Sequence, residues 1–96
     1  MADFYHVSIV PRPGISQDRV QKTMDLAIDW YRYHDTCWIL YTSSDATKWY
    51  GRLKGLVEPD GEVFIARLNM SDHFGYMSQE LWDWIVKNTS RQDYNG

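Results

Sequence analysis

The N-terminal segment alternates between two kinds of position. One set is apolar and the other is mixed: Tyr5, Val7 and Ile9 against Phe4, His6, Ser8 and Val10. This period of two predicts a β-strand over residues 4–10 with one apolar face and one mixed face. Pro11 and Pro13 end the strand, because a proline has no backbone N–H to donate to a neighbouring strand.

The next segment has helical spacing. Ser16 is the predicted N-cap. Apolar side chains recur three and four residues apart and form one stripe: Val20, Met24, Ala27, Ile28 and Tyr31. The stripe predicts a helix that ends near residue 30. Residues 30–34 also alternate as a strand does, so we expect a bent or paired strand from about residue 31 to residue 42.

A second helix is predicted after the aromatic and aliphatic run at residues 38–41. Ser43 or Ser44 is the expected N-cap, and the carboxylate of Asp45 favours the positive N-terminal end of the helix. Its apolar face has five members: Ala46, Trp49, Tyr50, Leu53 and Leu56. We expect the helix to stop at Gly55 or at the turn over residues 58–61.

Residues 62–68 are apolar on both sides apart from Glu62 and Arg67. That pattern is typical of a central strand covered on both faces. The helical layer supplies one cover, and a second subunit is the candidate for the other.

The C-terminal part has two interpretations. Residues 78–87 fit a short helix capped by Ser78, but Trp82, Trp84 and Val86 also alternate as an edge strand would. The polar residues 89–96 are expected to be a frayed tail. The whole pattern predicts an α+β fold with a single domain over residues 1–88. Its arrangement is a ferredoxin-like βαββαβ sandwich, with two helices on one face of an antiparallel sheet and a short C-terminal helix or edge strand.

Composition limits the range of candidate functions. Ninety-six residues build one domain. Five Trp and seven Tyr are more aromatic surface than so small a core can bury, so we expect an aromatic face for a partner. The net charge of −3 disfavours a strongly electrostatic nucleic-acid binder. Cys37, the single cysteine, is interpreted as a buried structural thiol. With no secretion signal or membrane span recognised, we expect a cytoplasmic protein.

Several segments of the chain resemble a known group of small proteins. They are residues 38–44 (Trp-Ile-Leu-Tyr-Thr-Ser-Ser), Leu53, residues 60–68 (Asp-Gly-Glu-Val-Phe-Ile-Ala-Arg-Leu) and Trp84 with Ile85. Over residues 36–86 this pattern resembles the CRISPR-associated endoribonuclease-like subunits and the ferredoxin-like antitoxin endoribonucleases, including short SinR-like proteins. The resemblance implies a homodimer formed through the sheets.

Some members of that group cut RNA or DNA with a metal ion held by an aspartate at the end of the first strand. In this chain the strand ends Ser8-Ile9-Val10-Pro11, and Asp3 lies at its other end. A hard cation such as Mg²⁺ needs at least one well-placed carboxylate. We therefore expect no bound metal and no cofactor.

Two groups of residues are candidates for chemistry. If the first strand pairs antiparallel with residues 62–68, His6, Ser8 and Arg67 can share a face and bind phosphate or exchange protons. The competing interpretation is that they are hydrogen-bonded residues at a subunit contact. Asp72 and His73, in the loop after the last predicted strand, are candidates for metal ligands or a base, against a solvated turn.

Two further patterns carry less weight. Residues 6–8 and 34–36 both read His-x-Ser/Thr, as in two-histidine phosphoesterases, but three residues match easily by chance. An aromatic set is a candidate for stacking on bases, although few basic residues lie among its members: Trp30, Tyr33, Trp49, Trp82 and Trp84. Core packing and a dimer interface explain these rings better.

Two functions follow from the sequence. The favoured one is a small non-catalytic interaction protein, antitoxin-like or an inhibitor encoded by a mobile element, which binds a protein or a nucleic acid as a homodimer. The expected binding residues are His6, Ser8, Trp30, Tyr33, Arg67, Trp82 and Trp84. The alternative is a small endoribonuclease or phosphodiesterase that uses His6, Ser8 and Arg67, with Asp72 or His73.

Overall fold

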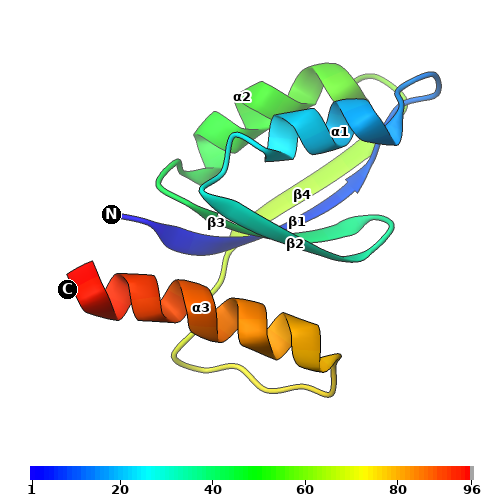
Figure 1. The fold of residues 1–96 in the computed structure, drawn as a ribbon. Coiled ribbons are helices and arrows are strands. Elements are labelled where there is room, and N and C mark those ends of the chain that lie inside the picture. The colour runs from blue at the N-terminus through cyan, green and yellow to red at the C-terminus, as the bar shows by residue number, and fades with distance from the viewer. Residues whose placement is uncertain (96) are drawn as a thin grey trace.

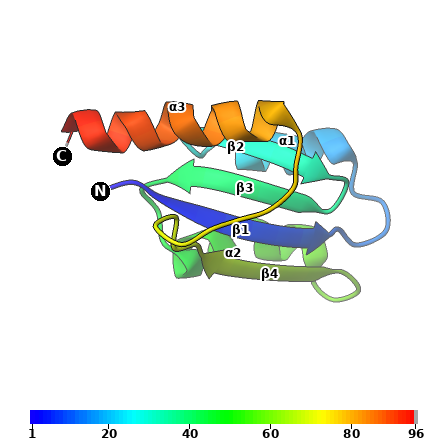
Figure 2. The same ribbon diagram turned by 90° about the horizontal axis from the view of Figure 1, so that it is seen from below.

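Four strands and three helices make up the part of the chain described by the computed structural model, which covers the backbone of residues 1–95 and the side chains of residues 1–91. In chain order they are β1 (Asp3–Val10), α1 (Gln17–Met24), β2 (Asp29–His34), β3 (Cys37–Thr42), α2 (Ala46–Val57), β4 (Glu62–Arg67) and α3 (Gln79–Asn95). The strands form one antiparallel sheet in the order β2-β3-β1-β4 (Figure 2). The fold is thus a small α+β domain.

The main core lies between the sheet and the pair α1 and α2, which pack on one face (Figure 1). The alternating positions of β1 and β3 supply the sheet side of this core: Tyr5, Val7, Ile9, Trp38 and Leu40. The helices contribute the buried side chains Val20, Met24, Trp49, Leu53, Leu56 and Val57 to the same core. The predicted apolar face of β1 is therefore confirmed.

A second core lies on the opposite face, where α3 packs (Figure 1). Phe4, Ile39 and Tyr41 project from the sheet and meet Leu81, Trp84 and Ile85 of α3. The sheet is thus apolar on both faces, because both alternating sets of β1 and β3 contain large apolar side chains.

A polar contact ties α3 to β2. The fully buried Asn88 donates from Nδ2 to Asp29 Oδ2 (3.1 Å) and to the carbonyl of Trp84 (3.0 Å), and Lys87 Nζ lies 2.9 Å from Asp29 Oδ2. Burial alone would raise the pKa of Asp29, but hydrogen bonds, led by those from Lys87 and Asn88, outweigh burial and hold the pKa below its usual value. The carboxylate stays charged and fixes the helix on the sheet.

The first helix is shorter than predicted. Ser16 caps it as expected, accepting from Arg19 N, but it ends at Met24. The chain then turns, and Trp30 Nε1 donates to Asp25 Oδ1 (2.7 Å) across that turn. Ile28 already donates its N–H to Tyr41 O (2.9 Å), so the chain has reached the sheet where the helix was expected to continue. Pairing of β2 with β3 outweighs the helical spacing of Ala27, Ile28 and Tyr31.

The extended segment over residues 31–42 is two paired strands, the second form expected for it. A bulge interrupts the register between Arg32 and His34, next to the hairpin turn. The predicted cap of α2 was wrong: Asp45, not Ser43 or Ser44, is the N-cap, and its Oδ1 accepts from Lys48 N (2.9 Å). The helix ends at Val57, at the turn over residues 58–61.

Two other predictions need correction. The strand over residues 62–68 was expected to be central, but β4 lies at an edge of the sheet (Figure 2). Of the two interpretations of the C-terminal part, the helix is confirmed and the edge strand was wrong. The helix α3 continues to Asn95, so most of the expected frayed tail is helical. Residue 96 lies outside the described residues.

Gly61 joins the end of α2 to β4 at a very close approach. A Cβ atom placed there would lie 2.4 Å from Val10 O, 2.8 Å from Arg12 N and 2.9 Å from Val57 O. All three atoms belong to the backbone, so a side chain at position 61 would fit only if the backbone shifted. Gly51, inside α2, has open space around the same position.

These two glycines predict opposite effects of alanine. Gly61→Ala should lower the free energy of unfolding by about 1–3 kcal/mol, because it overpacks a backbone contact. Gly51→Ala should raise it by about 0.5–1 kcal/mol, because alanine favours a helix interior. Urea unfolding of both variants beside the wild type measures the two changes. Equal stability of the two variants would contradict the close approach at Gly61.

Candidate functional site

The α3 side of the sheet is covered unequally. α3 lies over the β2 side, and the segment over residues 68–78 crosses the sheet to reach it (Figure 2). The same face is open where β1 ends and β4 begins. There Val10 is 46% exposed and Phe64 is 65% exposed. Phe64 lies directly opposite the half-buried Ser8. We call Ser8, Val10 and Phe64 the open patch.

His6 lies on the same face as the open patch and is partly buried. Its Nε2 is 2.5 Å from the hydroxyl of Tyr33, which comes from the bulged end of β2. Cys37 lies beside Tyr33 and is half-buried, so the predicted burial of this thiol is only partial. Three titratable side chains therefore meet on this face, and the direct neighbours of His6 across the sheet are Ile39 and Ala66.

Both partners of this hydrogen bond are held in their neutral forms. Burial lowers the pKa of His6 below its usual 6.5. Burial, together with the neighbouring Cys37, raises the pKa of Tyr33 to about 12. A neutral phenol and a neutral imidazole form an ordinary hydrogen bond. The residues that face His6 across the sheet include no carboxylate to raise the basicity of its ring.

Arg67 does not join His6 and Ser8. β1 and β4 do pair antiparallel, but Arg67 lies opposite Tyr5 and so projects from the other face of the sheet. Its side chain is 69% exposed, and its guanidinium lies 3.7 Å from the carboxylate of Asp3. The predicted set of His6, Ser8 and Arg67 is therefore not formed.

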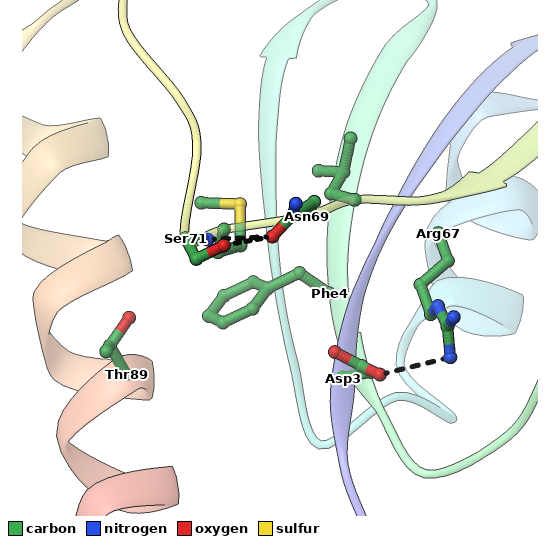
Figure 3. A pocket seen from close by; sticks show the side chains of 8 residues that line it. Asp3, Phe4, Arg67, Asn69, Ser71 and Thr89 are labelled. Carbon is green, nitrogen blue, oxygen red and sulfur yellow. Dashed lines mark hydrogen bonds and ion pairs between the residues drawn. The ribbon is translucent and has the colours of Figure 1, made fainter.

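Arg67 instead borders a pocket of about 620 Å³, lined by polar and apolar side chains, where β1 begins and β4 ends (Figure 3). Its polar groups bond to one another: Asp3 pairs with Arg67, and Ser71 donates to Asn69 Oδ1 from both N (3.1 Å) and Oγ (2.5 Å). The ring of Phe4 lies at the centre of the lining but is 1% exposed, so it offers no stacking surface.

Asp72 and His73 lie in the exposed segment that crosses the sheet. His73 Nδ1 is 2.8 Å from Met70 O, and its ring stacks on Trp82 with centroids 6.2 Å apart. Tyr33 lines the same hollow as these two residues, whereas His6 and Ser8 do not. Among the described residues, no three His, Cys, Asp or Glu side chains gather closely enough to hold a metal ion.

The predicted aromatic set separates into two groups. Trp49 and Trp84 are buried, and Trp30 packs on Trp38 with centroids 4.8 Å apart, so core packing is confirmed for these three rings. Tyr33 and Trp82 line a hollow beside α3. Trp30 and Trp84 therefore do not form the accessible aromatic surface that their expected binding roles require.

Phe64 and Val10 were missed as candidate surface residues. Their apolar character was visible in the sequence, but the same pattern fits a central strand. Only the strand order places them at an uncovered edge. Phe74 and Tyr76 were also missed. Both are fully exposed in the described structure, and a loop with alternating aromatic residues is the signal that was available.

The His6–Tyr33 contact predicts a pH dependence. The folded chain binds fewer protons at His6 than the unfolded chain between the two pKa values, so the free energy of unfolding should fall as the pH drops from about 7.5 to about 5. His6→Gln keeps a polar partner for Tyr33 but does not titrate, and it should flatten this slope. Urea unfolding at several pH values measures it. An unchanged slope in His6→Gln would contradict the assignment.

Comparison with known proteins adds no relative. No protein-family model, curated protein or solved structure matches this chain. The resemblance over residues 36–86 therefore stays a prediction. None of the helices in the described part of the chain is both long and apolar enough to cross a membrane.

Proposed function

We propose that this chain is a small non-catalytic interaction protein, antitoxin-like or an inhibitor encoded by a mobile element, which acts in the cytoplasm as a homodimer and binds a protein partner. The two copies join through the edges of β4. The observation that carries this proposal is the exposure of Phe64, 65%, on β4, a strand at the edge of the sheet.

The two edges of the sheet differ in a way that supports this choice. β2 carries a bulge and two charged side chains, Asp29 and Arg32. β4 pairs with β1 in unbroken register, and the four residues between its charged ends, 63–66, are all apolar. Natural sheets rarely leave an apolar edge strand exposed, because its unpaired backbone groups can pair with another strand. A second copy of β4 supplies that strand.

A two-fold axis at Phe64 gives a complementary pairing. In an antiparallel pair, side chains directly opposite must share a face, so a two-fold register is centred on a single residue. Centred on Phe64, it sets this ring against the partner subunit's Phe64 and sets Val63 against the partner subunit's Ile65. Glu62 then faces the partner subunit's Ala66. Each ring that leaves water contributes about 1.5–3 kcal/mol.

The strand order and the two helices on one face support a ferredoxin-like arrangement, which leaves the edge strands as natural pairing sites. A single cysteine, with no second for an intrachain disulfide, suits a reducing compartment. The nuclease alternative is not favoured, because Arg67 projects from the opposite face to His6 and Ser8.

Phe64→Glu should convert a dimer into a monomer. The substitution sets two carboxylates against each other at the axis and removes the apolar ring pair. Leu26→Glu is the matched control, because Leu26 is 61% exposed but lies between α1 and β2, far along the chain from β4. Light scattering coupled to size-exclusion chromatography, at tens of micromolar protein, gives the mass of each species.

The expected result is a dimer for the wild type and Leu26→Glu, and a monomer for Phe64→Glu. A monomeric wild type would overturn the homodimer. A dimer that survives in Phe64→Glu would overturn the β4 interface.

A further inference from the structure

An apolar groove lies between α3 and the segment that crosses the sheet. It encloses about 360 Å³, and its walls come from three parts of the fold: Met70 and Met77 from the segment, Leu81 and Trp82 from α3, and Tyr33 and Ile39 from the sheet. A second hollow adjoins it along Trp82 and is lined by Gln79 as well. We call the two together the loop groove.

The segment at the rim of the loop groove presents unpacked aromatic rings. Every residue from 71 to 80 is exposed, and Phe74 and Tyr76 are exposed as fully as in an extended chain. Phe74 lines both hollows. Aromatic residues beside an apolar pocket are typical of energetically dominant positions in protein interfaces.

The stretch of chain that forms most of the loop groove has acidic side chains but neither lysine nor arginine. From residue 68 to residue 86 the chain has three carboxylates, Asp72, Glu80 and Asp83, and no lysine or arginine. Asp72 lines the groove. Asp83 accepts a hydrogen bond from Gln79 and Glu80 accepts one from Tyr31, and within the described residues none of the three carboxylates forms an ion pair. Within the described residues, no ion pair therefore neutralises the charge of these three carboxylates.

We propose that the loop groove binds a basic, apolar segment of a partner protein, with a leucine or aromatic side chain in the hollow and flanking lysine or arginine residues beside the carboxylates. The inference rests on the proposed function and names the chemistry of the partner. An apolar anchor fits the lining, and cations complement the carboxylates. The same charges repel nucleic-acid phosphates and anionic lipid headgroups, and they disfavour a second copy of this acidic chain.

A labelled short peptide of alternating lysine and leucine with one phenylalanine serves as the probe. Fluorescence anisotropy measures its affinity for the wild-type chain. Two reference peptides separate the contributions: one replaces lysine by glutamate, and the other replaces the apolar residues by serine. A labelled single-stranded RNA tests the competing occupant. We expect the basic apolar peptide to bind at least about tenfold more tightly than each reference, since a buried anchor and its charge complement both contribute.

Variants locate the site. Phe74→Ser removes a fully exposed ring, so the fold should not change, and the affinity for the probe should fall about tenfold. The double change Asp72→Asn with Asp83→Asn should weaken binding and flatten its salt dependence. Val86→Ser, on the exposed side of α3 outside the groove lining, is the matched control and should bind as the wild type does.

Absence of probe binding, equal binding of the glutamate peptide, preferential binding of RNA or equal loss in Val86→Ser would each overturn the proposal. The mass of the wild-type chain is measured separately. A dimer that ignores the probe contradicts the loop groove alone, whereas a monomer that binds the probe contradicts the β4 interface alone.

Discussion

The structure depends on a sheet that is apolar on both faces and therefore needs a cover on each side. α1 and α2 cover one face, where Trp38 and Trp49 are buried. On the other face a single helix, α3, must cover a surface of the same width. It is fixed over the β2 side by the contact of Asp29 with Lys87 and Asn88. One helix is too narrow to cover four strands, because its diameter is about 10–12 Å and strands lie about 4.8 Å apart.

Both proposed surfaces follow from that unequal cover. The far side of the face, toward β4, has the open patch and an edge of the sheet. Between the β4 end and α3 the chain must cross the sheet, and the crossing segment leaves the loop groove beside the helix. The two surfaces use different residues, so a dimer joined at β4 would carry two loop grooves.

Local patterns predicted the parts of the fold that local interactions determine. The alternation in β1 and the apolar stripe of α2 led to the correct elements, because each buries one side of a regular structure. The end of α1 was misjudged because long-range pairing of β2 with β3 decides it. Arg67 was placed on the wrong face because a shift of one residue reverses every side chain of a strand. The edge position of β4 has no signal of its own in the sequence.

The central claim is that the edge of β4 is paired in solution, and hydrogen exchange measured at two protein concentrations tests it most directly. Backbone N–H groups that point outward from β4 are slow to exchange only when another strand accepts their hydrogen bonds. We expect the outward-pointing amides of Val63 and Ile65 to lose protection on dilution, while the amides of Phe64 and Ala66, which point toward β1, keep theirs. Protection of the outward-pointing amides that is the same at both concentrations, and weak at each, would contradict the claim.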